Sequence, residues 1–169
     1  VTYQSVDVAH GDRRIRLYLI GYEPGRLGAP HEIAFGRNIS RSRFEVVSDV
    51  SAGLKLGAKI RLGRDTFTVV GLTKGMVSSG GDPVAFVSLR DSQKLPFDLA
   101  PPAVRRELAR GATISGTDIV NAVVVRLSPN VSPDTVAADI RRWKHLSVLT
   151  QEQQEAVLGK SVIERARRQ

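Results

Sequence analysis

The stretch that decides the fold is DVSAGLKLGAKIRLGRDTFTVVGL, residues 49–72. At its centre, Ala58–Leu62 alternates apolar with charged side chains, the pattern of a strand with one buried face. Gly63-Arg64-Asp65 is a short turn, and Thr66–Val70 is rich in β-branched and aromatic residues, as strands are. The stretch therefore predicts a tight hairpin whose buried face holds Ile60, Leu62, Phe67 and Val69.

The residues before the hairpin predict a single helical turn. Ser48 or Asp49 can cap this turn, because a short side-chain oxygen accepts hydrogen bonds from the free amides at a helix N-terminus. Gly57 can end it, because glycine adopts the left-handed conformation at little cost. We therefore predict a capped helical turn that leads directly into the hairpin.

Further strands are predicted on both sides of this centre. Before it, the strand-like segments are Tyr3–Ala9, Ile15–Ile20 and Glu45–Ser48. After it, Val84–Leu89 predicts a buried strand, and Asp91–Leu95 follows as a helical turn. The most continuous apolar run, which predicts a strand in the centre of a sheet, is Val120–Leu127.

The C-terminal third predicts two helices with a short strand, His145–Leu149, between them. Ser132-Pro133 opens the first helix, whose spacing predicts a buried stripe of Val136, Ile140 and Trp143. Thr150-Gln151-Glu152-Gln153 has the form of a capping box that opens the second. Because strands and helices do not alternate regularly, the predicted class is α+β, with mixed sheets and a few short helices.

Composition allows one domain of 169 residues and leaves two function classes open. The chain has 41% hydrophobic residues, no cysteine and a net charge of +8. Such a charge is compatible with a basic nucleic-acid-binding α+β module, although the arginines are scattered and the aromatic content is only 5%. The alternative is a solvated basic surface, or one that is attracted to anionic headgroups.

No catalytic or metal-binding motif is recognisable in the sequence. The three histidines, His10, His31 and His145, do not have the spacing of metal ligands. No serine has a histidine nearby in the sequence that would activate it as a nucleophile. We therefore predict that the chain is not an enzyme and that it holds no cofactor.

The Gly75–Pro83 segment is the candidate for a partner contact. It contains three glycines and two adjacent serines, with little to anchor it, so we predict a mobile loop. Its central residues would make the contact and order on binding, and a plain surface loop is the alternative. These candidate contact residues are Met76, Val77, Ser78 and Ser79.

Several pieces of the chain resemble one known family in their order and spacing. They are Gly21-Tyr22-Glu23-Pro24, Gly36-Arg37, the Leu56–Gly71 hairpin, Phe86–Leu89 with Asp91-Ser92-Gln93 after it, Asn121–Val125 and the Val136–Trp143 helix. Together they resemble the extracytoplasmic domain of MacB/FtsX-type ABC transporter permeases, and among these the DevC-like exporter permeases most. The resemblance covers most of the chain, from about Leu17 to Gln169.

The resemblance implies a non-catalytic domain on the periplasmic side of the bacterial inner membrane, between the first two transmembrane helices of a permease. In this family the domain docks a periplasmic adaptor (membrane fusion) protein and relays ATP-driven conformational change. The implied partners are that adaptor, a cytoplasmic ATPase subunit that binds the ATP, and a second permease copy. Nucleic acid is not an implied partner.

The resemblance also implies two lobes within the single domain 1–169. A hairpin-rich distal lobe would span about residues 21–118, and a membrane-proximal strand/helix lobe about 1–20 plus 119–150. A stalk helix, 151–169, would continue into the second transmembrane helix, with its arginines near the lipid headgroups. Family members carry a further strand-helix segment before the position of Val1.

Overall fold

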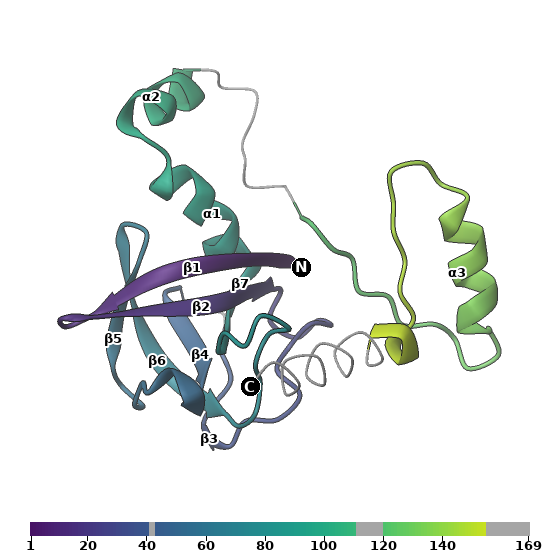
Figure 1. Cartoon of the computed structure of the whole chain (residues 1–169), viewed down its shortest axis with the longest axis horizontal. Helices are drawn as coiled ribbons and strands as arrows, with labels where there is room; N and C mark the ends of the chain where they lie inside the picture. Colours follow the sequence, from purple (N-terminus) through teal and green to yellow (C-terminus); the bar gives the residue numbers. More distant parts are fainter. Residues whose placement is uncertain (41–42, 111–119, 155–169) are drawn as a thin grey trace, which may run out of the picture. The chain divides into compact units, whose positions relative to one another are not determined.

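The predicted hairpin lies within a mixed sheet in the computed structural model, which describes residues 1–40, 43–110 and 120–154 (Figure 1). Contacts divide the chain into two compact units, Val1–Val124 and Val125–Gln169. The strands are β1 Thr2–His10, β2 Arg13–Tyr22, β3 Phe35–Gly36, β4 Glu45–Asp49, β5 Lys59–Leu62, β6 Asp65–Thr73 and β7 Val84–Ser88. The helices are the 3₁₀ turn η1 Val50–Ala52, α1 Leu89–Leu99, α2 Pro102–Arg110 and α3 Pro133–Arg141. These elements confirm the predicted α+β class.

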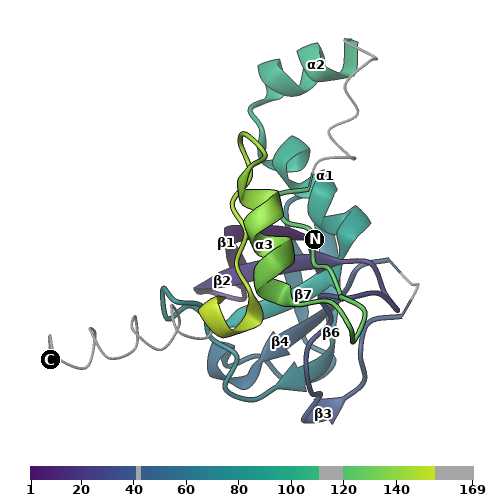
Figure 2. The ribbon, with the colours of Figure 1, turned by 90° about the vertical axis from the view of Figure 1, so that its right-hand side faces the viewer.

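The sheet closes on itself. Its strand order is β3-β6-β4-β7-β2-β1-β5, and β5 also pairs with β6. The β2–β7 and β4–β6 pairs are parallel, and the other pairs are antiparallel. The β1–β5 junction consists of a single register pair, Ala9 opposite Arg61. This closed sheet wraps around an interior, with α1 at one end and β3 at the other (Figures 1 and 2).

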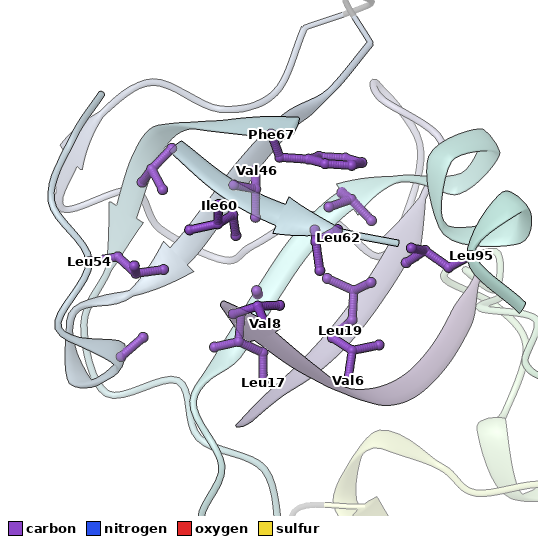
Figure 3. Close-up of a cluster of buried hydrophobic side chains, with 14 of the residues drawn as sticks. Val6, Val8, Leu17, Leu19, Val46, Leu54, Ile60, Leu62, Phe67 and Leu95 are labelled. Atoms are coloured by element: carbon purple, nitrogen blue, oxygen red, sulfur yellow. The ribbon is translucent and has the colours of Figure 1, made fainter. Parts of the chain in front are cut away.

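The alternation in the hairpin fills this interior. Ile60, Leu62, Phe67 and Val69 are each 1% exposed, which confirms the predicted buried face. Figure 3 shows the side chains of the interior cluster converging from several strands, together with Leu95 of α1. The ring of Phe67 meets that of Phe44 edge-on, with 5.5 Å between the ring centroids. The main strand residues that join the hairpin in this core are Val6, Val8, Leu17, Leu19, Val46, Leu72, Ala85 and Val87.

The predicted helical turn is η1, with one correction. Asp49 is its N-cap, and the Asp49 carboxylate accepts a hydrogen bond of 3.0 Å from the amide of Ser51. The turn ends at Gly53, which has a φ of 71°, and not at Gly57. Gly57 is also left-handed, with a φ of 78°, and it directs the chain into β5. Because both glycines favour the left-handed region, their spacing alone did not decide which one ends the turn.

Helix α1 packs at one end of the closed sheet, against β1, β2 and β7 (Figure 1). Ser88 caps the helix, and its hydroxyl accepts a hydrogen bond of 3.1 Å from the amide of Asp91. Ser92 contacts β1 through its hydroxyl, which lies 2.5 Å from the hydroxyl of Thr2. Its carbonyl accepts a hydrogen bond of 3.0 Å from the side-chain amide of Gln4. Gly21 of β2 is required beneath this contact, because a Cβ atom there would clash with Ser92 and Thr2.

A second apolar cluster lies on the outer face of the sheet, beneath the segment between β2 and β4. Its buried residues are Tyr22, Ile39, Val47, Val84 and Phe86. The hydroxyl of Tyr22 donates a hydrogen bond of 2.7 Å to the side chain of Asn38, and burial raises the pKa of Tyr22 to about 12. The covering segment is therefore fixed to the sheet by packing and by a buried hydroxyl.

An ion pair between Arg37 and Glu45 ties the same segment to the start of β4. Glu45 is 9% exposed and also accepts hydrogen bonds from the amide and hydroxyl of Ser40, at 2.9 and 3.1 Å. The Arg37 guanidinium, helped by Ser40, lowers the pKa of Glu45 to about 2, although burial opposes this shift. Neighbouring Gly36 has a φ of 75°, and a Cβ atom there would clash with the carbonyl of Val70.

The prediction of a central strand at Val120–Leu127 is wrong. The structure assigns no strand to these residues, and Val123 and Val125 are 77% and 64% exposed. Its hydrogen bonds to the start of the chain are few: the main chain of Ala122 exchanges hydrogen bonds of 3.0 and 3.3 Å with Val1. The Asn121 side chain likewise binds the backbone of Tyr3. A run of β-forming residues remains irregular when no neighbouring strand pairs with it along its length.

The second unit, Val125–Gln169, contains the predicted helix α3 but not its predicted buried stripe. Ala137 is its buried residue, and Trp143 is 62% exposed, so Trp143 is not a core anchor. The predicted strand at His145–Leu149 is also absent from the described structure. The capping box is confirmed: the Gln153 amide binds the Thr150 hydroxyl at 3.3 Å, and the Thr150 amide binds the Gln153 side chain at 3.2 Å.

Two predictions about domain organisation stay predictions. The proposed lobes, 21–118 and 1–20 plus 119–150, have other boundaries than the two compact units, and β1 and β2 share a sheet with β4–β7. Of the predicted stalk helix, residues 151–154 are helical, and 155–169 lie outside the described residues. Among the residues described, no helix combines the length and apolar character that a membrane crossing requires.

Candidate partner-contact site

The candidate contact loop, Gly75–Pro83, joins β6 to β7. Val77 and Pro83 form an isolated antiparallel β-bridge, so the loop folds back on itself, although β6 and β7 do not pair with each other. The amide of Ser78 donates to the carbonyl of Asp82 at 2.8 Å, and the amide of Gly81 donates to the carbonyl of Ser78 at 2.8 Å. The hydroxyl of Ser78 accepts a further hydrogen bond of 3.1 Å from the Asp82 amide. The expectation that little anchors this loop is therefore wrong, whereas its mobility stays a prediction.

Asp49 anchors the base of the loop from the end of β4. Its carboxylate accepts hydrogen bonds from the amide of Met76 at 2.8 Å and from the hydroxyl of Thr73 at 3.1 Å. It also accepts from the amide and the hydroxyl of Ser51, at 3.0 and 2.6 Å. The side chain is fully buried, and burial alone would raise its pKa. The hydrogen bonds outweigh burial and lower the pKa of Asp49, so the residue stays an acceptor at neutral pH.

The four candidate contact residues divide into two pairs. Met76 is partly buried and packs against the outer cluster that contains Tyr22 and Phe86. Ser78 uses its hydroxyl within the loop. Val77 is 47% exposed, and Ser79 is also exposed. Met76 and Ser78 therefore shape the loop, whereas Val77 and Ser79 are the two candidate residues that are exposed.

An exposed aromatic side chain beside the base of the loop was not predicted. Phe35 on β3 is 50% exposed, and β3 pairs with β6 through Phe35 and Leu72. The Lys74 ammonium lies 5.9 Å from the centre of the Phe35 ring, at the residue where β6 gives way to the loop. Sequence reasoning did not single out Phe35, because its position depends on a strand pair that joins it to Leu72, 37 positions further along the chain.

The described residues offer little for chemistry. Across 1–40, 43–110 and 120–154, no group of three histidine or acidic side chains is arranged to hold a metal ion. His10 hydrogen-bonds at 3.2 Å to the carbonyl of Lys59, and it therefore supports the β1–β5 junction. The buried carboxylates of Glu45 and Asp49 are satisfied by structural donors. These polar groups therefore act within the fold, as hydrogen-bond partners that hold its segments together.

Comparisons with known proteins agree with the resemblance. Two solved structures are similar to this chain: the extracellular domain of the noncanonic ABC-type transporter YknZ from Gram-positive bacteria, and the periplasmic region of MacB from Actinobacillus actinomycetemcomitans. The first is 14% identical with a TM-score of 0.43, and the second is 16% identical with a TM-score of 0.40. The matches cover 55% and 66% of this chain, and the chain spans 53% and 64% of those two proteins.

No curated protein matches the chain. Residues 8–143, however, match the family described as the MacB-like periplasmic core domain. This match extends from Val8 in β1 to the second residue after α3, so it includes the closed sheet except the first six residues of β1. The chain therefore belongs to the MacB-like periplasmic core domain family.

Proposed function

We propose that this chain is the non-catalytic domain through which an ABC-type exporter permease docks its periplasmic adaptor and relays ATP-driven motion. It would lie on the periplasmic side of the bacterial inner membrane, and it would act beside a second permease copy. The domain would hold no cofactor, because ATP would bind to a separate cytoplasmic subunit. Membership of the MacB-like family supports the transporter context.

The observation that carries the docking proposal is the set of hydrogen bonds that anchors the contact loop. Asp49 fixes the base of the loop, and the Ser78 hydrogen bonds fix its tip. Val77 and Ser79 remain exposed. A loop held by such hydrogen bonds loses less conformational entropy on binding than an unanchored one, which favours its use as a docking surface.

The closed sheet supports the relay proposal. Strand β7 runs directly from the contact loop to α1, with no residue between β7 and the helix. Residues of β7 are buried on both faces of the sheet: Ala85 and Val87 in the interior cluster, and Val84 and Phe86 in the outer one. A strand that is packed on both sides cannot shift alone, because close-packed interiors transmit displacement. A load on the loop would therefore move the sheet and α1 together.

The test is site-specific photo-crosslinking in the full-length permease with its adaptor. A photoreactive residue at Val77 or Ser79 should crosslink to the adaptor. The matched control is the same residue at Asp12, which is exposed in the turn between β1 and β2. Equal crosslinking from Asp12 and from the loop, or none from the loop, would contradict the docking proposal.

A further inference from the structure

The outer face of the sheet carries two arginines that flank a small residue across three strands. Ala9 of β1 lies opposite Arg14 of β2 and also opposite Arg61 of β5. Directly opposite residues point to the same side of a sheet, and all three are exposed. Because neighbouring strands lie about 4.8 Å apart, the backbones of the two arginines are separated by roughly 10 Å. Both long side chains can therefore reach over Ala9.

The three residues border a hollow at the place where β1 and β5 part. It has a volume of about 240 Å³ and is also lined by Asp7 and Gly63. Asp7 and Gly63 are the positions at which the next β1–β5 pair would form, but Ala9–Arg61 is the single pair in this register. The methyl group of Ala9 leaves space above the sheet that a larger side chain would fill.

Neither guanidinium has a counter-ion in the part of the chain that the structure describes. Arg14 and Arg61 make no ion pair and no side-chain hydrogen bond with a described residue. The neighbouring Arg16 differs, because it lies 3.9 Å from the carboxylate of Asp82. Asp7 contributes one negative charge to the lining, so the hollow keeps an excess of one positive charge over its three charged residues.

We propose that this hollow binds a phosphate group, which Arg14 and Arg61 hold from opposite sides above Ala9. A carboxylate has two oxygens, and one guanidinium fork already engages both. A phosphate group presents more acceptor oxygens and more charge, so it can engage both forks at once. The family is periplasmic, so the sources considered are free phosphate and phospholipid headgroups. The proposal does not depend on adaptor docking.

The first test titrates inorganic phosphate into the 169-residue chain at constant ionic strength and follows backbone amide NMR shifts. We expect saturable shifts at Asp7, Ala9 and Gly63, with millimolar affinity. Arg14→Gln and Arg61→Gln should each weaken binding about tenfold, since each removes a charge-assisted fork. Asp7→Asn should tighten binding about threefold, because it removes a repelling charge.

Two further variants separate a defined site from a general attraction to basic surface. Ala9→Leu leaves the charge unchanged but fills the floor of the hollow, and it should abolish saturable binding. Arg16→Gln removes the same charge from the next outward position of β2 and should change the affinity less than twofold. Shifts that fail to saturate, or that survive Ala9→Leu in a folded protein, would overturn the proposal. Acetate that binds as tightly as phosphate would overturn the choice of ligand.

A second arm identifies the source of the phosphate. Vesicles of phosphatidylcholine with and without phosphatidylglycerol are compared by flotation with the unsubstituted chain, Ala9→Leu and Arg61→Gln. Binding that needs phosphatidylglycerol and is lost in both variants supports a lipid headgroup. Saturable binding of inorganic phosphate, together with vesicle binding that is equal in all three proteins, supports free phosphate as the ligand.

Discussion

The β5–β6 hairpin and the Val120–Leu127 segment are both rich in apolar and β-branched residues, yet they have opposite environments. The hairpin buries one side of each strand, and Phe67 is 1% exposed. In the other segment Val123, Val124 and Val125 are 77%, 44% and 64% exposed. The two regions differ less in hydrophobicity than in the strand partners that lie beside them. Strand β6 pairs with β3, β4 and β5.

This comparison shows what an apolar run needs to become a strand. Alternation specifies which side of a strand faces the core, and a neighbouring strand satisfies its backbone. The hairpin brings both conditions within one short stretch. The Val120–Leu127 segment is joined to the start of the chain by hydrogen bonds to Val1 and Tyr3, through Ala122 and Asn121, and not by a strand ladder. Its residues can therefore be changed with little effect on the closed sheet, whereas those of the hairpin cannot.

The largest effect is expected for Phe67→Ala. The ring is buried in the interior cluster and packs edge-on against Phe44. Its removal should lower the free energy of unfolding by about 3–5 kcal/mol. Chemical denaturation followed by far-UV circular dichroism measures this loss. A midpoint equal to that of the unsubstituted chain would show that the hairpin is not the core of the sheet.

Asp49→Ala should cost about 2–3 kcal/mol, because it removes the cap of η1 and leaves buried donors on Met76 and Thr73 unsatisfied. Amide exchange at Met76 and Ser78 should accelerate as the loop loses its anchor. Asp49→Asn is the matched control, since it keeps one acceptor oxygen and should cost less. If exchange in the loop stays unchanged, Asp49 does not hold it.

Glu45 should make stability depend on pH in acid. Its pKa in the folded protein is about 2, below the ordinary value of 4.5. A lowered pKa means that the stabilising contribution is complete above the ordinary pKa and is lost as the pH falls from about 4.5 towards 2. We expect a contribution of about 1–2 kcal/mol, because half-exposed Arg37 is screened by solvent.

The measurement for Glu45 is the free energy of unfolding between pH 5 and pH 2, compared with that of Glu45→Gln. The variant should be less stable at pH 5 and should lose less stability on acidification. Parallel pH profiles for the two proteins would show that the Arg37–Glu45 pair does not produce the effect.

The smallest effect is expected for Val123→Thr and Val125→Thr, which should each change the free energy of unfolding by less than about 0.5 kcal/mol. Both side chains are exposed, so the added hydroxyl replaces no buried methyl group. The contrast with Phe67→Ala is the sharpest test of the comparison. A loss above 2 kcal/mol at either valine would mean that the segment is buried in a sheet.

Local patterns in the sequence predicted the hairpin, the capped turn and the Thr150 capping box, because each depends on neighbours within a few residues. The sheet closure was not predictable in this way, since Ala9 and Arg61 meet across 52 positions of the chain. Helix α1 was predicted only as a turn, because Pro96 lies in its interior, where proline ordinarily ends a helix. Likewise, only tertiary packing decides that Met76 is packed against the outer cluster while Val77 is exposed.

The order of the strands in the closed sheet has a kinetic consequence. One edge of β2 pairs with β7, and β7 begins 62 residues after β2 ends. That edge therefore stays uncovered until β7 joins the sheet. Pairings between such distant segments raise the contact order, and domains of this kind fold in milliseconds to seconds. Until β7 has been made and has reached the sheet, the nascent chain exposes the unpaired edges of β2 and β4. We therefore expect this domain to need protection from aggregation during its biogenesis, before β7 joins the sheet.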